Sequence, residues 1–354
     1  MKFKAVGMIG KCRRLALAAI AGSMLGTSVV QADPVEDFYS GRQVTMVVSA
    51  SAGGVYAVHA LALAPYIAAH LPGNPDIIVD YMTGAGGLRA MNYVFANAPQ
   101  DGSVIALVQS AVPYAPLYGT EAAQFDPAQM NIIGSLNSTT GMCVAWHESG
   151  IKTWSDLFDK EFFVGSSGAG SQMEIFPMVL NKLFGTNIKI ISGYPGGNEV
   201  FNAMERGEVD GRCGSLVAGI KSTRPDWFPQ QKVVVPIQIA FERNLEFSDT
   251  PALGEFVEDE TTRQVLELVL SPMEAFSPLI APPGVPEGRV AALRTAFHDA
   301  MADPDFLSEA ERIGIEINPV GHNRVTQVLE RAYAMPPDIV AAAKDAMSLT
   351  GGGE

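Results

Sequence analysis

The sequence predicts an α/β fold of two lobes, each a mainly parallel sheet flanked by helices, with a ligand cleft between the lobes. Strand-like and helix-like segments alternate over most of the chain, and this alternation forms two separate series. Glycine-rich loops follow predicted strands in both series. Ligands in such sheets bind at the carboxyl ends of the strands, which is where these loops fall.

The first 32 residues have the features of a cleaved export signal. Five Lys and Arg residues precede an apolar run from Leu15 to Val30, and the residues up to Ala32 suit cleavage before Asp33. The alternative is a membrane anchor, but the apolar run has about 16 residues and falls short of the roughly 20 that span a bilayer. Cys12 precedes the run, which argues against a lipid anchor.

The first series follows the signal and reads as strand, helix, strand, helix, strand. Short apolar runs predict the strands, and apolar residues at helical spacing predict the helices. These elements cover Gln43–Ser49, Tyr56–His70, Ile77–Asp80, Leu88–Ala98 and Val104–Val108. Such a pattern implies parallel strands joined by right-handed crossovers.

The second series begins near Ile132. Its expected strands are Met142–Trp146, Glu161–Gly165, Ile188–Ser192, Val209–Cys213 and Val233–Ala240, with helices at Gln172–Phe184 and Asn198–Arg206 and a short helix after Thr153. The chain then ends in helices from Glu287 and from Val325. We expect one lobe from residues 33–135 plus about 241–354, and the other from about 136–240.

The charge balance excludes some classes of partner. The chain has 24 Lys and Arg against 38 Asp and Glu, and five of the basic residues lie in the signal. An acidic surface argues against nucleic acid and against anionic lipid headgroups. An anionic ligand would also be repelled at long range, so its binding would have to depend on local dipoles inside a cleft.

The two remaining cysteines, Cys143 and Cys213, lie 70 residues apart without C-x-x-C spacing, so zinc and thioredoxin-like sites are not indicated. In an exported protein they could form a disulfide. Two buried free thiols are the alternative, and the sequence leaves both open.

Motifs for catalysis are missing. Ala169 stands where a nucleophile elbow around Ser167 would need its second glycine. The five histidines form no H-x-x-x-H pair, and no phosphate-binding G-K-[ST] motif occurs. The stretch from Gly84 to Gly86 starts like a dinucleotide fingerprint but lacks the third glycine. We therefore expect a protein that is not an enzyme and has no metal or cofactor.

Three loops share the chemistry of an anion site: Ser49–Gly54, Thr83–Gly87 and Ser166–Ser171. Each offers small side chains, hydroxyls and backbone N–H groups where a strand turns into a helix. Carboxylates accept several such bonds, and charge-assisted bonds are strong. For any single loop, an ordinary helix start with nothing bound is the alternative.

The order of several further motifs makes the chain similar to one family. These motifs are Phe38–Val48, Ala52–Tyr56, Leu71–Pro75, Met82–Ala90, Asn97–Gly102, Gly193–Gly197 and Ala203–Gly211. Over nearly the whole mature chain the sequence resembles the substrate-binding receptors of tripartite tricarboxylate transporters, the Bug or TctC-like family.

The resemblance implies a type II-like periplasmic binding protein that closes on a small organic carboxylate. It implies delivery to the large and small membrane subunits of a transporter, and we expect a monomer. A periplasmic sensor that signals to a membrane kinase is the first alternative, and a secreted α/β hydrolase is the second.

In the family, backbone N–H groups and bridging waters hold the carboxylate. Carried over to this chain, the ligand-binding residues are Ser51, Ala52, Gly53, Gly54, Val55, Tyr56, Ala85, Gly86, Gly87, Leu88, Ser110, Ser166, Ser167, Gly168, Ser171, Tyr194 and Asp210. Asp210 could instead only pin the end of its strand. Arg89 and Arg212 adjoin the loops, and a solvated or structural arginine is the alternative for each.

The first loop departs from the family pattern. Relatives usually have G-G-G-[TY]-D followed by an arginine, whereas this chain has Val55 for the third glycine, Ala57 for the acid and Leu61 for the arginine. A wall of Val55, Tyr56 and Val58 would suit a longer apolar, aromatic or dicarboxylic acid better than aspartate or glutamate.

Overall fold

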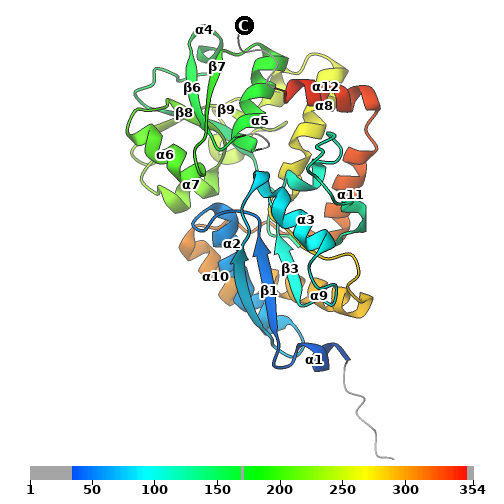
Figure 1. Ribbon diagram of the computed structural model, residues 1–354. Helices are drawn as coiled ribbons and strands as arrows, with labels where there is room; N and C mark the ends of the chain where they lie inside the picture. Colours follow the sequence, from blue (N-terminus) through cyan, green and yellow to red (C-terminus); the bar gives the residue numbers. More distant parts are fainter. Residues whose placement is uncertain (1–33, 169–170, 349–354) are drawn as a thin grey trace, which may run out of the picture. The chain divides into compact units, whose positions relative to one another are not determined.

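Strands and helices alternate through most of the computed structural model, which describes residues 34–168 and 171–348 (Figure 1). The expected export signal lies outside these residues. They belong to one compact unit that begins at Pro34. Over the described part of the chain, no helix combines the length and the apolar character needed to cross a membrane.

The strands are β1 (Gln43–Val48), β2 (Asp76–Tyr81), β3 (Val104–Leu107), β4 (Asn131–Ser135), β5 (Gly141–Trp146), β6 (Phe162–Ser166), β7 (Ile188–Ser192), β8 (Gly211–Leu216), β9 (Val233–Ile239), β10 (Pro278–Ala281) and β11 (Val320–Gly321). The α-helices are α1 (Pro34–Tyr39), α2 (Val55–His70), α3 (Leu88–Ala96), α4 (Asp156–Asp159), α5 (Gln172–Val179), α6 (Gly197–Glu205), α7 (Val217–Thr223), α8 (Glu260–Leu270), α9 (Glu287–Ala302), α10 (Pro304–Ile313), α11 (His322–Tyr333) and α12 (Pro337–Ala346).

The strands form two sheets, which confirms the predicted α/β class. The first sheet has the order β11-β4-β10-β3-β1-β2, and the second has the order β7-β6-β8-β5-β9. The first takes its strands from residues 43–135 and 278–321, and the second from residues 141–239.

The expectation that the sheets are mainly parallel is wrong, because both are mixed. In the first sheet β1 is parallel to β2 and β3, whereas β10 runs antiparallel to β3 and β4. In the second, β6 is parallel to β7 and β8, whereas β5 runs antiparallel to β8 and β9. The chain enters the reversed strands β5 and β10 when it crosses from one sheet to the other. Strand β11, antiparallel to β4, is reversed as well.

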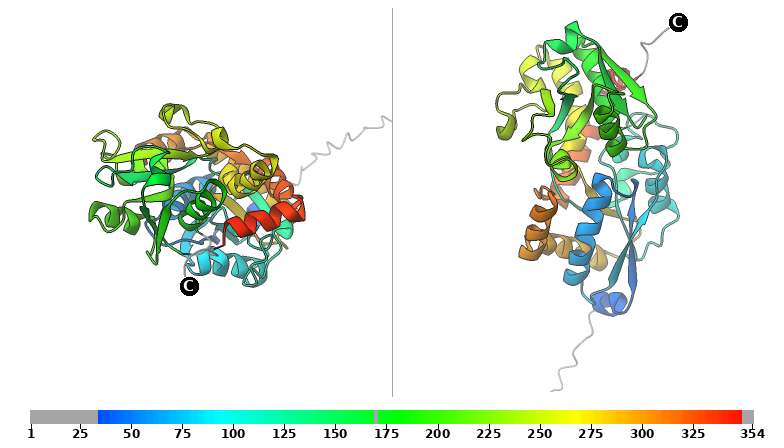
Figure 2. Two further views of the ribbon diagram at one scale, coloured as in Figure 1. Left: turned by 90° about the horizontal axis from the view of Figure 1, so that it is seen from above. Right: turned by 90° about the vertical axis from the view of Figure 1, so that its left-hand side faces the viewer.

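Helix α2 is central to the packing beside the first sheet. Its residues Leu63 and Ile67 are fully buried, and α2 contacts β1, β2, α9 and α10. Figures 1 and 2 show α9 and α10, drawn in orange, beside α2. Because both sides of α2 are covered, apolar residues surround this helix rather than forming one stripe. This packing holds the start of α2 in place.

The two cysteines are joined. Cys143 on β5 and Cys213 on β8 form a disulfide between antiparallel neighbours of the second sheet. Of the two alternatives left open by the sequence, the structure has the disulfide.

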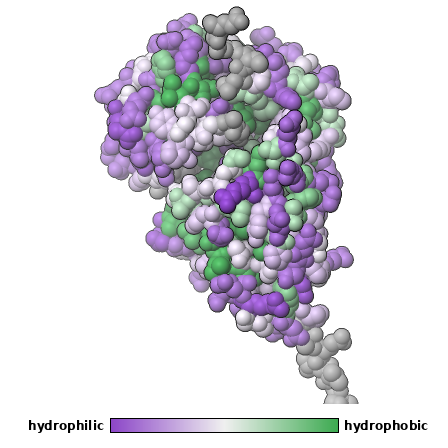
Figure 3. Space-filling model, viewed as in Figure 1, coloured by the Kyte–Doolittle hydropathy of each residue, from purple (hydrophilic) through white to green (hydrophobic). Residues whose placement is uncertain are grey.

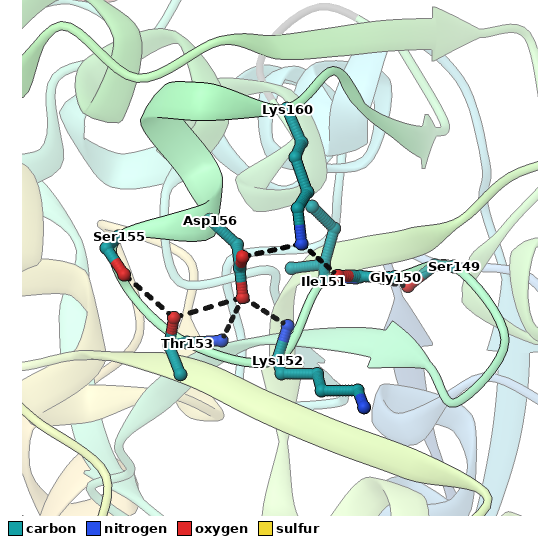
Figure 4. A network of polar contacts seen from close by, with 8 residues as sticks. All are labelled: Ser149, Gly150, Ile151, Lys152, Thr153, Ser155, Asp156 and Lys160. Carbon is teal, nitrogen blue, oxygen red and sulfur yellow. Dashed lines mark hydrogen bonds and ion pairs between the residues drawn. The ribbon is translucent and has the colours of Figure 1, made fainter.

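The connection from β5 to β6 is held by Asp156 (Figure 4). Its Oδ2 accepts hydrogen bonds from the backbone N–H groups of Lys152 and Thr153, both at 2.9 Å, and its Oδ1 lies 2.6 Å from Nζ of Lys160. The bond to Lys160 and these backbone bonds lower the pKa of the Asp156 carboxyl, which therefore stays ionised in this turn.

Candidate functional site

A cavity of about 570 Å³ lies where loops of the two sheets meet. Its lining includes loops that follow β1, β2 and β3 of the first sheet and β6 and β7 of the second. The space-filling view shows a recess on the face drawn in Figure 3. The cavity thus lies at the carboxyl ends of these strands, where α/β proteins bind their ligands.

Four helices of eight or more residues begin at this cavity. The residues that precede their first turns all line it: Gly54 for α2, Gly87 for α3, Ser171 for α5 and Gly196 for α6. None of the four helices has a side-chain cap. The first N–H groups of a helix have no partner within the helix, and the helix dipole adds positive potential there.

The loop after β2 requires its glycines. Gly84, Ala85, Gly86 and Gly87 have φ values of 128°, 48°, 63° and 99°, all in the range that disfavours side chains. A Cβ at Gly87 would come within 2.8 Å of Cγ2 of Val112 and 3.2 Å of Oγ of Ser49. This loop therefore brings its backbone closer to the loop after β1 than a larger residue would allow.

Gln109 ties the loops after β1 and β3 together. Its backbone N–H donates to Oγ of Ser49 at 2.8 Å, and its Nε2 donates to the backbone oxygen of Ser49 at 2.9 Å. Both residues line the cavity. These bonds hold the first-sheet side of the site in one arrangement before any ligand arrives.

Tyr56 forms a buried part of the wall. Its ring stacks on Phe276 with centroids 5.1 Å apart, and its hydroxyl oxygen accepts a hydrogen bond from the N–H of Ser110 at 3.2 Å. Burial raises the pKa of Tyr56 to about 12. The side chain therefore presents a neutral, fixed surface to the cavity.

His59 also lines the cavity and carries no charge at neutral pH. Its Nδ1 lies 2.7 Å from Oγ of Ser277, and both side chains are buried. Burial lowers the pKa of His59 to about 4.

Arg212 provides the formal positive charge in the lining. Burial lowers its pKa to about 10, so the guanidinium is still charged at neutral pH. Its Cζ lies 4.7 Å from the centroid of the Phe201 ring. The described lining residues include no Asp or Glu, so the positive charge in the cavity is not offset there by a carboxylate.

Two hydrogen bonds connect the second-sheet side of the cavity to the first. Nδ2 of Asn198 donates to the backbone oxygen of Gly53 at 3.0 Å, and Nε2 of Gln172 donates to Oγ of Ser110 at 3.1 Å. A ligand in the cavity would thus contact loops that are already bonded to each other.

Most of the predicted site residues lie together. The lining includes Ser51, Gly53, Gly54, Val55, Tyr56, Ala85, Gly86, Gly87, Ser110, Ser167, Gly168 and Ser171. Ala52, Leu88, Ser166, Tyr194 and Asp210 are not among the described lining residues. Ala169 and Gly170, in the middle of the third predicted loop, lie outside the described residues.

Two of the residues outside the lining have structural contacts. The carboxylate of Asp210 accepts a hydrogen bond from the N–H of Phe163 at 3.0 Å, so it pins the strand end, as its alternative interpretation held. Ser166 is fully buried and donates to Oε2 of Glu174 at 2.7 Å.

Ala57, one of the three substitutions in the first loop, is also fully buried, whereas Val58 lines the cavity.

Sequence reasoning missed several residues of the cavity: His59, Gln109, Gln172, Asn198, Phe201 and Phe276. Arg212 was noticed only as a neighbour of the loops. Asn198 could have been found, because it follows the Gly196–Gly197 pair that opens α6. Arg89, by contrast, is exposed and donates to the backbone oxygen of Thr83 at 3.4 Å.

Comparison with known proteins identifies a sequence family. The sequence model described as "TctC: Tripartite tricarboxylate transporter family receptor" matches residues 67–333. No curated protein sequence matches the chain.

Solved structures share the fold. MatC (Rpa3494) from Rhodopseudomonas palustris with bound malate superposes with a TM-score of 0.65 at 21% identity, covering 87% of this chain and 99% of that one. The periplasmic binding protein BugD gives 0.67 at 20% identity, covering 87% and 98%. R. palustris Rpa4515 with adipate gives 0.67 at 18% identity, covering 86% and 97%. At these identities the likeness concerns the fold alone.

Proposed function

The chain belongs to the tripartite tricarboxylate transporter receptor family, and we propose that it captures a small organic carboxylate in the periplasm and delivers it to the membrane subunits of such a transporter. The family acts by binding a substrate and not by converting it. The proposed partners are the large and small membrane subunits, and the proposed receptor is a monomer.

The observation that carries this proposal is the meeting of four uncapped helix starts in one cavity. Gly54, Gly87, Ser171 and Gly196 stand at these starts, and no described lining residue bears a carboxylate. Each helix end contributes roughly half an elementary charge of positive potential. Their N–H groups are donors that a ligand carboxylate satisfies with charge-assisted bonds.

This arrangement also fits a chain whose net charge is −14. Long-range forces repel an anion from such a protein, because the acidic surface dominates at a distance. Inside the cavity, however, the ligand meets fixed dipoles at close range. Selectivity for anions then arises within the cavity and not from steering by the whole protein.

We propose that two lobes close on the ligand, one from residues 33–135 plus about 241–354 and the other from about 136–240. The ligand favours closure because it bonds to both sides of the cavity only when they meet. The bond from Asn198 to Gly53 and the bond from Gln172 to Ser110 lie between these sides. The membrane subunits then recognise the closed form.

The composition of the wall supports a preference among carboxylates. Val55, Val58 and Phe276 line the cavity together with the buried ring of Tyr56. Apolar ligand atoms gain free energy by leaving water beside such groups, whereas the ammonium group of an amino acid finds no lining carboxylate among the described residues. We propose a longer dicarboxylic or aromatic acid. Adipate, named for one related structure, is a dicarboxylate of this longer kind, and malate, named for another, is a shorter dicarboxylate without an ammonium group.

A thermal-shift screen tests the proposal. The purified protein is heated with malate, adipate, benzoate, aspartate and glutamate, and in parallel with the neutral amides of the first three acids. We expect at least one of the first three acids to raise the unfolding temperature while its amide does not. The proposal would be contradicted if no acid raised the unfolding temperature, or if acids and their amides raised it equally. A strongest response to aspartate or glutamate would reject the proposed selectivity alone.

A further inference from the structure

We propose that Arg212 forms a direct ion pair with one carboxylate of the ligand, so that the receptor selects dicarboxylates whose other carboxylate binds the N–H groups at the starts of α2 and α3. This inference rests on the proposed function and adds a specificity-determining residue to it. Arg212 lies near the start of β8 and lines the cavity together with Gly197, Phe201 and Gly214.

Arg212 has no ion pair with any described carboxylate within 4.0 Å. Its Nε is buried and lacks a hydrogen-bond partner among the described residues. Its Nη2 makes only a long contact of 3.4 Å to the backbone oxygen of Gly214. A half-buried charge without a carboxylate partner is costly, because water solvates it less well.

Arg224, in the same region, is an arginine whose donors have polar partners. Its Nε lies 2.8 Å from Oε1 of Glu205, and its Nη2 lies 2.5 Å from Oδ1 of Asn202. Arg224 also stands within 6.0 Å of the Phe201 ring but does not line the cavity. Both arginines thus lie near the ring of Phe201. Arg212 lines the cavity and has no counterion among the described residues, whereas Arg224 lies outside the lining and is paired.

The guanidinium of Arg212 also lies against the start of α6. A Cβ built at Gly197 would overlap Nη1 of Arg212, so the absence of a side chain at Gly197 makes room for the cation. A cation at a helix N-terminus is unfavourable, because the helix dipole is positive there. The acid in the first turn of α6, Glu199, is exposed and forms no ion pair with Arg212. A bound anion would supply the missing counterion of Arg212 and would reduce the repulsion between the guanidinium and the start of α6.

The ring of Phe201 restricts the orientation of the N–H groups of Arg212. The ring lies 4.7 Å from Cζ of Arg212, a distance at which an aromatic face attracts a guanidinium. A guanidinium held in this way offers a planar fork of N–H groups that matches a carboxylate. Nε of Arg212 is buried, so the fork offered to the ligand is the edge formed by Nη1 and Nη2. The site is therefore suited to a carboxylate and less to a neutral hydroxyl.

The charge count favours a ligand with two carboxylates. Four helix starts supply roughly two elementary charges of positive potential, and Arg212 adds one full charge. A monocarboxylate would leave most of this potential unneutralised in a cavity with no described lining acid. The helix starts of α2 and α3 belong to the first-sheet side and Arg212 to the second, so a dicarboxylate would join the two sides.

Isothermal titration calorimetry with matched acids tests the inference. Succinate, adipate and suberate are each compared with the monocarboxylate of equal length, namely butyrate, hexanoate and octanoate. The proteins are the wild type, R212M, R212K and the control R224M. Met replaces the arginine stem but not its charge, and R224M removes a neighbouring arginine that does not line the cavity.

We expect the wild type to bind its best dicarboxylate roughly 30-fold or more tightly than the matched monocarboxylate. R212M loses most of this advantage, because it weakens dicarboxylate binding more than monocarboxylate binding. R212K retains part of the advantage, and R224M retains all of it. The unfolding temperature of ligand-free R212M is expected to equal or exceed that of the wild type, since an unpaired half-buried charge is gone. This result also shows that R212M is folded.

G197A provides a second variant that keeps the charge. Alanine favours the helix more than glycine does, but its Cβ displaces the guanidinium. We expect G197A to remain folded and to bind the dicarboxylate more weakly. If R212M and G197A bind dicarboxylates as the wild type does, the inference fails while the proposed function stands. If the wild type binds no carboxylate, both fail.

Discussion

The side-chain amide of Asn198 donates a hydrogen bond to the backbone oxygen of Gly53 across 3.0 Å. Asn198 lies in the first turn of α6, and Gly53 precedes the start of α2. One bond therefore joins two of the four helix starts at the cavity, although the residues are 145 positions apart in the chain.

We expect N198A to bind the ligand about five-fold more weakly, because a neutral hydrogen bond contributes about 1 kcal/mol. The loss should appear in the dissociation rate, since the bond holds the two sides of the cavity together. Stopped-flow measurement with the best acid of the thermal-shift screen checks this.

A matched control is N92A. Nδ2 of Asn92 donates to the backbone oxygen of Ala122 at 2.9 Å, outside the cavity. N92A removes this bond and a second one, which the N–H of Gln124 donates to Oδ1 of Asn92 at 2.8 Å, and should still leave the dissociation rate unchanged. Equal effects of the two variants would contradict a role for Asn198 in holding the ligand.

His59 makes stability depend on pH. Its pKa in the folded protein is about 4, below its ordinary value of 6.5, because it is buried. As the pH falls below 6.5, the unfolded chain binds a proton that the folded chain does not, so the free energy of unfolding decreases until about pH 4. The full loss is about 3 kcal/mol.

Urea unfolding of the wild type and H59N between pH 7 and pH 4 measures this contribution. The wild type should lose more stability than H59N over this interval, and the difference between the two losses should be about 3 kcal/mol. Parallel pH profiles would show that His59 does not titrate as its burial implies.

We expect G87A to destabilise the protein by about 1–3 kcal/mol and to weaken ligand binding. Gly87 has φ 99°, and a Cβ there would press on Val112. Gly41 is the control, because it has φ 66° but no atom within 4 Å of a built Cβ.

Chemical unfolding and calorimetry on both variants separate the two effects. G41A should show a smaller loss of stability, caused by its backbone alone, and normal affinity. If G87A kept normal affinity, the backbone of this loop would not contact the ligand.

The disulfide between Cys143 and Cys213 closes a stretch with a sequence separation of 70. By the chain-entropy argument, its loss should lower the free energy of unfolding by about 4 kcal/mol. Unfolding of the wild type with and without reductant measures this loss. The double variant C143A/C213A should be insensitive to reductant. A wild type equally insensitive would show that the bond does not form in the protein.

Local patterns sufficed to predict much of the first-sheet side of the cavity. Each of its loops is a strand followed by glycines and a helix, and these signals lie within about a dozen residues of sequence. Gly54 and Gly87 were therefore expected at helix starts, where they are. The same reasoning gave the two series of strands, although β8 begins at Gly211 and not at Val209.

Features that depend on distant residues could not be predicted in this way. The unusual environment of Arg212 arises because α6 places Gly197 and Phe201 beside it. Strand β10 was not predicted because it has only four residues, Pro278–Ala281, directly before a proline-rich turn, and it gains its partners from β3 and β4. The antiparallel pairing of β5 and β10 likewise follows from where the chain crosses between sheets, which no local pattern records.

A crystal structure of the protein with the acid that gives the largest thermal shift tests the central claim most directly. We predict a carboxylate within hydrogen-bond distance of the N–H groups at the start of α2 or α3, inside the cavity lined by Gly54 and Gly87. An acid bound elsewhere on the protein, with this cavity holding only water, would contradict the account.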